Sequence, residues 1–265
     1  MKPALGRLAV SRVSKAFEDR GGAALVLDHC SLELEPGTLT VMVGPSGCGK
    51  TTLINLIAGY ERPTSGEILL DGRPVNGPGA DRLVVFQETA LFPWMSVLDN
   101  IAFGPLARGT GARTEVLERA RTLLGKVGLR GFADRYPRQL SGGMQRRVEL
   151  ARAIINEPTL MLMDEPFRGL DAMTRELMQE HYLRLFEERP RTNLFVTSEL
   201  KEAVFLGDRL LVMTQKPTRV LRAIDIDLPR PREFHMLTSA RFREIYEEAL
   251  VALHGDGGPT LVRSS

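Results

Sequence analysis

Cysteine is scarce in this sequence, and long apolar runs are absent. The 265 residues include two cysteines, Cys30 and Cys48, so no disulfide framework is expected and a reducing compartment is favoured. No run approaches the ~20 apolar residues that a membrane-spanning helix needs. Residues 1–10 also lack the apolar stretch of a signal peptide. Any association with a membrane is therefore expected to go through a partner.

An excess of either charge sign is absent as well. The sequence has 35 basic and 33 acidic residues, a formal net charge of +2. Nucleic-acid binders usually carry a clustered basic face, so no nucleic-acid partner is expected. The run Gln145-Arg146-Arg147 is interpreted as a solvated helix face. With 43% hydrophobic residues, the chain is predicted to bury a large core, mostly in one domain.

Short apolar strands alternate with helical segments along much of the chain. Strands are predicted around residues 8–13, 32–34, 39–43, 83–86, 160–163, 193–197 and 210–213. Helices are predicted over residues 51–58, 172–187 and 199–206, with Gly59 as a C-cap of the first. The alternation in the second half favours a mainly parallel sheet covered by helices, an α/β fold.

The middle of the chain, residues 96–156, reads as mostly helical. Residues 113–127 are amphipathic, and Met144, Val148, Ala151 and Ile155 recur at helical spacing. This pattern predicts a helical subdomain inserted at about residues 88–156 into a single domain spanning residues 1–254. Residues 255–265 are glycine-rich and polar and are expected to form a flexible tail.

The strongest motif lies between the strand at 39–43 and the helix at 51–58. Its glycines allow backbone N–H groups to point at phosphate oxygens, and the helix adds its positive N-terminal end. Lys50 supplies a cation for the β- and γ-phosphates, and Thr51 a hydroxyl for Mg²⁺. The pattern predicts a P-loop that binds a nucleotide through Gly44, Pro45, Ser46, Gly47, Cys48, Gly49, Lys50, Thr51 and Thr52. Cys48, near a helix N-terminus and Lys50, is expected to be reactive.

A second motif ends the apolar strand at residues 160–163. Two carboxylates, Asp164 and Glu165, follow this strand directly. After a P-loop at this distance, the first carboxylate is expected to hold Mg²⁺, directly or through water. Glu165 is expected to act as the general base that polarises the attacking water.

A third motif, Leu140-Ser141-Gly142-Gly143-Met144-Gln145, resembles the signature of ATP-binding-cassette (ABC) ATPases. Ser141 suits an N-cap, and Gly142 and Gly143 suit close approach of backbone to a phosphate. The resemblance extends over about residues 8–252 and implies the P-loop fold of this family, with N-terminal antiparallel strands. It also implies ATP and Mg²⁺ as cofactors.

The same resemblance assigns further residues. Gln87 resembles the glutamine that touches Mg²⁺ and relays movement to the membrane subunit, and Phe17 the aromatic that stacks on adenine. Asp171 resembles an aspartate that meets the partner ATPase subunit. The implied partners are a second nucleotide-binding subunit, identical or different, membrane-spanning permease subunits and, indirectly, a solute-binding protein. The implied location is the cytoplasmic face of the inner membrane.

Flanking segments resemble one branch of the family, the importers of nitrate, sulfonates and taurine. These segments are residues 77–82, 91–94 and 164–167, together with the short C-terminal part. An energy-coupling import ATPase is therefore expected. Soluble relatives in DNA repair or translation are disfavoured, because they carry long coiled-coil insertions or two cassettes in one chain.

Two positions depart from the family pattern. Arg168 stands where the branch usually has glycine, and Ser198 where the family has a histidine that contacts the γ-phosphate. A serine is shorter and uncharged, and its hydroxyl could instead cap the helix that follows. The four histidines lie elsewhere in the sequence. An alternative function follows: a subunit that closes on ATP but hydrolyses it slowly.

Overall fold

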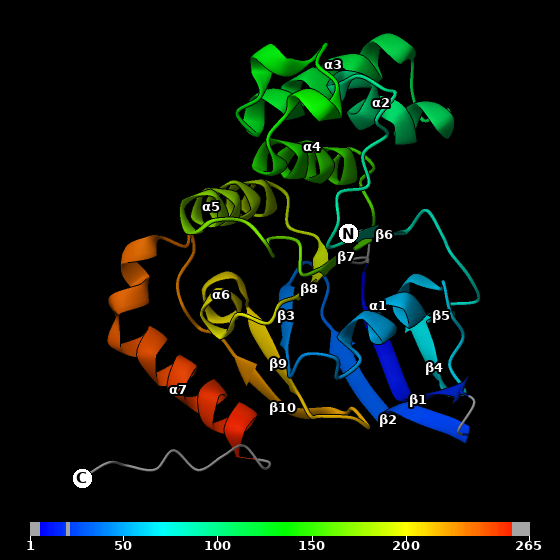
Figure 1. The fold of residues 1–265 in the computed structure, drawn as a ribbon, viewed down its shortest axis with the longest axis vertical. Coiled ribbons are helices and arrows are strands. Elements are labelled where there is room, and N and C mark those ends of the chain that lie inside the picture. Colours follow the sequence, from blue (N-terminus) through cyan, green and yellow to red (C-terminus); the bar gives the residue numbers. More distant parts are fainter. Residues whose placement is uncertain (1–5, 20–21, 256–265) are drawn as a thin grey trace. The chain divides into compact units, whose positions relative to one another are not determined.

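A computed structural model describes residues 6–19 and 22–255. The chain divides into two compact units, and their helices and strands are labelled in Figure 1. The first takes in the described residues of Met1–Pro78 and Thr192–Ser265, and the second is Gly79–Arg191. The described residues include no helix that is both long and apolar enough to span a bilayer.

An antiparallel sheet of order β2-β1-β4-β5 opens the first unit. It consists of β1 (Leu8–Asp19), β2 (Gly22–Leu34), β4 (Ser65–Leu70) and β5 (Arg73–Pro74). Leu8, Val10, Leu32 and Leu34 are buried, as their alternation predicts. The register shifts between Val10 and Val13. β1 continues to Asp19, past the predicted end at residue 13. The N-terminal antiparallel strands expected from the sequence are confirmed.

A second sheet of the first unit is built around β3 (Leu39–Val43). It pairs in parallel with β8 (Thr192–Val196) and β9 (Arg209–Met213), and β10 (Val220–Asp225) pairs antiparallel with β9. Every residue of β3 and β8 is buried, as expected for strands covered on both faces. The helices are α1 (Lys50–Ala58), α6 (Leu200–Leu206) and α7 (Ala240–His254), with η3 (Phe234–Thr238); α7 packs against α6, β9 and β10 (Figure 1).

The second unit contains a parallel pair of strands and a group of helices. The strands are β6 (Arg82–Val85) and β7 (Leu160–Asp164). Between them in sequence come α2 (Val97–Ala107), α3 (Arg113–Lys126), η1 (Arg130–Phe132), η2 (Pro137–Gln139) and α4 (Gly142–Ile154), and α5 (Ala172–Glu188) follows β7. Ile101, Val116, Leu124 and Val148 share the core of the helical part. The predicted helical middle is confirmed, whereas the outer domain boundaries remain predictions.

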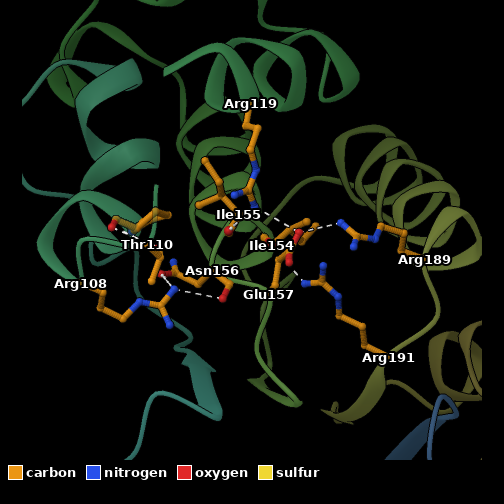
Figure 2. Close-up of polar contacts among 10 residues, drawn as sticks. Arg108, Thr110, Arg119, Ile154, Ile155, Asn156, Glu157, Arg189 and Arg191 are labelled. Carbon is orange, nitrogen blue, oxygen red and sulfur yellow. Dashed lines mark hydrogen bonds and ion pairs between the residues drawn. The ribbon is translucent and has the colours of Figure 1, made fainter. Parts of the chain in front are cut away.

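Arginines from three other segments bind the C-terminal end of α4 (Figure 2). The last carbonyls of a helix lack intrahelical partners, and cations are favourable there. Arg191 donates to the Ile154 carbonyl at 3.0 Å, and Arg119 to the Ile155 carbonyl at 3.2 Å. Arg108 donates to the backbone and side-chain oxygens of Asn156 at 3.1 and 2.9 Å. These contacts hold the end of α4 in place within its unit.

Glu157 completes this arrangement. Its Oε1 lies 2.6 Å from Arg189 and 3.1 Å from Arg119. Partial burial raises the pKa of Glu157, but the hydrogen bond and charge of Arg189, with the charge of Arg119, lower it overall. The carboxylate thus links the α3 helix to the segment after α5.

Predicted element ends agree with the structure to within one or two residues in most cases. The helix expected at 51–58 is α1, and Gly59 caps it with a φ of 80°. Five elements have no counterpart in the prediction: β4, β5, β10, η3 and α7. The expected flexible tail lies outside the described residues except for Gly255, whose N–H donates to the Val251 carbonyl.

Candidate functional site

The P-loop joins β3 to α1 in the first unit. The first α-helical hydrogen bond of α1 runs from the Leu53 N–H to the Gly49 carbonyl, so the N–H groups of Lys50, Thr51 and Thr52 precede the helical ladder. Gly47 and Gly49 have φ values of 72° and 119°, a region that residues with a side chain rarely adopt. Free N–H groups at a helix start, aligned with the helix dipole, form an anion site. The local geometry therefore fits phosphate, as the motif predicts.

The ammonium group of Lys50 is held inside this loop. Its side chain is buried, and Nζ donates to the carbonyl oxygens of Gly44 at 2.8 Å and Pro45 at 3.1 Å. A buried cation held only by neutral carbonyls gains electrostatic stabilisation from an added anion. The position of Lys50 thus supports its predicted contact with the β- and γ-phosphates.

Cys48 behaves differently from its sequence-based expectation. Its side chain is 2% exposed, and its backbone carbonyl accepts a hydrogen bond from the Thr218 hydroxyl. Burial opposes the reagent accessibility that the motif position suggested. Cys48 therefore fills space beneath the loop. The other cysteine, Cys30, is also buried, and burial raises the pKa of its thiol to about 11.

Phe17 and Ser198 also belong to the first unit. The ring of Phe17 on β1 is 38% exposed, so it is not a core residue, and Lys15 Nζ lies 4.8 Å from its centroid. Ser198 follows β8 and is exposed. It does not cap α6, contrary to the structural alternative: the cap residue is Glu199, whose N–H donates to the Thr197 hydroxyl at 3.0 Å. Adenine stacking by Phe17 and contact of Ser198 with phosphate remain predictions.

The two carboxylates after residue 163 lie in the second unit at the end of β7. Asp164 is the last residue of the strand and is buried. Glu165 has a φ of 44°, a left-handed backbone conformation that a non-glycine residue adopts at a cost of about 1–3 kcal/mol. Such outliers persist where the surroundings demand them, often at functional sites. The strand that leads to the two carboxylates is present as the sequence predicts, and the roles of Asp164 and Glu165 remain predictions.

Among the described residues no cluster of three or more histidine, cysteine or acidic side chains could hold a metal ion. Mg²⁺ commonly binds through one or two protein oxygens, waters and the phosphates of its nucleotide. The exposed Thr51 hydroxyl and the Asp164 carboxylate suit that mode. Thr51 in the first unit and Asp164 in the second remain the predicted Mg²⁺ ligands, with Gln87 as a further predicted oxygen donor.

The signature segment starts α4 in the second unit. Ser141 is the N-cap, and its hydroxyl accepts a hydrogen bond from the Met144 N–H at 3.3 Å, as expected. A Cβ added at Gly142 would meet nothing within 4 Å, whereas one at Gly143 would lie 2.6 Å from Thr174 Cγ2. Gly143 thus allows close packing of α5, and Gly142 leaves an exposed backbone surface that a phosphate could approach.

The backbone around Gln87 is bound to α4 by a buried ion pair. Arg146 and Glu149 are 4% and 6% exposed, and their side chains lie 2.5 Å apart. Arg146 donates to the carbonyl oxygens of Phe86, at 2.7 Å, and Gln87. Glu149 accepts from the Ala90 N–H at 3.0 Å. The interpretation of Arg146 as part of a solvated face is therefore wrong.

Burial raises the pKa of Glu149 and lowers that of Arg146, while the charge of each opposes the shift in the other. Each charge offsets part of the cost of burying the other, and the hydrogen bonds from Arg146 to the loop carbonyls add to this compensation. Sequence reasoning missed this connection. Its one local signal was the opposite charges at positions i and i+3 of a predicted helix.

Two further residues assigned from the family resemblance, Asp171 and Gln87, lie in the second unit. The Asp171 carboxylate caps α5 by accepting from the Thr174 N–H at 3.0 Å. Hydrogen bonds with the Thr174 side chain and N–H lower its pKa. Gln87 has an exposed side chain and is anchored by its backbone. The predicted residues thus form two groups, one in each unit. The P-loop, Phe17 and Ser198 lie in the first; Gln87, the signature, Asp164 and Glu165 lie in the second.

Comparisons with known proteins agree with this reading. The family model described as ABC transporter matches residues 27–168. An uncharacterized ABC transporter ATP-binding protein of Methanocaldococcus jannaschii is 46% identical over 92% of this chain and 90% of its own length. A taurine import ATP-binding protein, TauB, of Roseobacter denitrificans is 46% identical over 80% of each chain. The TauB of Pseudomonas aeruginosa PAO1 is 43% identical over 85% of this chain and 86% of its own.

Solved structures show the same relationship. The dimeric structure of MJ0796, a bacterial ABC transporter cassette, has a TM-score of 0.74 and 29% identity, covering 84% of this chain and all of the other. A post-hydrolysis dimer of the same cassette with ADP and Pi has a TM-score of 0.72. Together with the P-loop, the strand that ends at Asp164 and the capped signature helix, these matches show that the chain belongs to the ABC transporter family and is one of its ATPases.

Proposed function

We propose that this chain hydrolyses Mg-ATP to power solute import through a membrane ABC transporter. The observation that carries the proposal is the loop between β3 and α1, where a buried Lys50 ammonium and uncommitted helix N–H groups meet. The phosphates bind there, Thr51 and Asp164 hold Mg²⁺, and Glu165 takes a proton from the attacking water. Mg²⁺, when bound, neutralises charge on the phosphates.

The working form proposed is a pair of ATPase subunits, identical or different. Ser141, Gly142 and Gly143 of one subunit cover the ATP bound by the P-loop of the other. The exposed backbone at Gly142 supports this arrangement, and the similar cassette MJ0796 is a dimer. Closure on ATP and reopening after hydrolysis then move the attached membrane subunits by differential binding of ATP and ADP.

An exposed aromatic group in the second unit supports a permease contact. Trp94 is 70% exposed and stacks on Phe92 at 5.5 Å between ring centroids; Phe92 meets Phe103 at 4.8 Å. Arg152 lies 4.2 Å from the Phe92 centroid and donates to the Ala90 carbonyl. Aromatic residues are enriched in protein interfaces. The permease is proposed to bind here, which places the chain peripherally at the cytoplasmic face of the membrane.

The proposed cargo class is that of nitrate, sulfonates and taurine, supported by the taurine import relatives at 43–46% identity. The test is reconstitution of the chain with its permease and solute-binding protein in vesicles. ATP turnover and uptake should rise together when the binding protein carries taurine, another sulfonate or nitrate. Turnover that no solute of this class stimulates would exclude the cargo assignment while leaving the ATPase intact.

A second candidate, a subunit that closes on ATP but hydrolyses it slowly, is favoured by Ser198. Its side chain is exposed at the end of β8 and has no capping role in α6. It is therefore available for the position that a histidine takes in the family, but it is shorter and uncharged. Loss of one positioned polar group near developing charge typically costs on the order of 10²–10³ in rate.

Replacing Ser198 with histidine is expected to raise kcat on the order of 10²-fold, with little change in ATP affinity, because the P-loop makes most ground-state contacts. The measurement is steady-state ATP turnover and ATP titration of the purified complex. Ser198→Ala serves as the control and should resemble wild type. Brisk turnover by wild type, with no gain in the histidine variant, would show that another group fills this role.

A further inference from the structure

Arg168 forms an ion pair with the proposed base. Its Nη1 lies 2.9 Å from Oε2 of Glu165. The Glu165 side chain is 11% exposed, whereas that of Arg168 is 58% exposed. The carboxylate is therefore held on its open side by a long side chain that reaches in from solvent. Both residues belong to the second unit, on the turn that follows β7.

The turn does not need this ion pair for its shape. The Arg168 N–H donates to the Glu165 carbonyl at 3.1 Å, which closes a four-residue turn through the backbone alone. Pro166, the second residue of the turn, has a fixed φ that favours the same geometry. The guanidinium therefore acts on the carboxylate without determining the path of the chain.

We propose that Arg168 is a positioning residue that restrains the Glu165 carboxylate through this ion pair. Hydrolysis is slow while the pair is intact and becomes faster when it breaks. The inference rests on the proposed function, in which Glu165 accepts a proton from water. A guanidinium on Oε2 competes for the oxygen that has to take this proton, and it turns the carboxylate toward itself. ATP binding involves other residues and is not affected.

The size of the effect follows from the exposure of the Arg168 side chain, which is 58% exposed. An ion pair whose cation is open to solvent contributes little, because water and salt screen the charge. Breaking this one should raise kcat about two- to fivefold. The pair should also weaken as salt is added, so that the wild-type rate approaches that of a variant without the cation.

The test compares Arg168→Gly, Arg168→Gln and Arg168→Lys in the assembled complex, with kcat and the KM for ATP measured at low and high salt. We expect the first two variants to raise kcat about two- to fivefold at low salt and to lose that advantage at high salt, with KM unchanged. The lysine variant keeps a cation and should remain near wild type. In the Glu165→Gln background, Arg168→Gly should leave kcat unchanged, because the carboxylate that Arg168 restrains is already absent.

If the wild-type complex hydrolyses ATP, and the folded Arg168→Gly and Arg168→Gln variants show an unchanged or lower kcat, the proposed restraint is overturned. A change in the KM for ATP as large as the change in kcat would also overturn the restraint, since it would show that the substitution affects ATP binding. A wild-type complex that binds ATP but never hydrolyses it would overturn the proposed function itself. The two failures are therefore distinguishable by the wild-type rate alone.

Discussion

Replacing Lys50 with alanine is expected to lower ATP turnover about 10³-fold or more, the upper end of the cost of losing one positioned group at a reacting phosphate. The ammonium lies inside the loop, 2.8 Å from the Gly44 carbonyl and 3.1 Å from that of Pro45. Phosphate binding adds negative charge beside it, most of all as charge moves onto the leaving oxygen. Mg-ATP affinity should fall as well, because the same cation contacts the ground state.

The measurement is ATP titration and steady-state turnover of wild type and Lys50→Ala. Lys201→Ala is a suitable control, because this exposed lysine lies on α6 of the same unit and outside the proposed site. Since Lys50 is buried, thermal unfolding of each variant should be recorded too, so that a loss of fold is recognised. Equal affinity and turnover in a folded Lys50→Ala protein would contradict the assignment of the loop.

The P-loop could be predicted from the sequence because its determinants are local. The strand Leu39–Val43, the glycines and the helix start at Lys50 lie within a short stretch, and each residue's role follows from backbone geometry. The cap at Ser141 is equally local. The resemblance to ABC ATPases added the ATP and the partner subunit, which no local argument supplies.

Long-range contacts were the part that the sequence could not show. Arg146 reads as a solvated residue because its neighbours are charged, yet it is buried by a loop 59 or 60 residues earlier in the chain. Cys48 was expected to be reactive from its place beside a helix N-terminus, but packing buries it. Helix α7 was predictable in principle, since Phe242, Ile245 and Ala249 form a buried stripe at helical spacing.

Replacing Glu165 with glutamine is expected to lower turnover on the order of 10²–10⁴-fold, the typical contribution of a general base. The amide keeps the shape of the side chain and can still accept a hydrogen bond from Arg168, so the turn after β7 should persist. It cannot take the proton of the attacking water. ATP should bind and close the pair of subunits as before, but the step that reopens them is removed.

ATP-dependent dimers of Glu165→Gln should therefore accumulate, and ADP should not produce them. Light scattering coupled to size-exclusion chromatography, with ATP or ADP in the buffer, measures this directly. Glu180→Gln is the matched control, because Glu180 is an exposed glutamate on α5 that also pairs with an arginine, Arg184, at 2.7 Å. Its turnover and its oligomeric state should match those of wild type.

Two results would change the assignment in different ways. Unchanged turnover in Glu165→Gln would remove this residue from the role of base, and the left-handed backbone at φ 44° would then need another explanation. Lost turnover without ATP-dependent dimers would place the block before closure, at nucleotide binding. Glu165 is 11% exposed and directly follows a fully buried strand, so its substitution could affect folding. An unfolding temperature equal to that of wild type would show that the fold is intact and that the substitution removes the kinetic step itself.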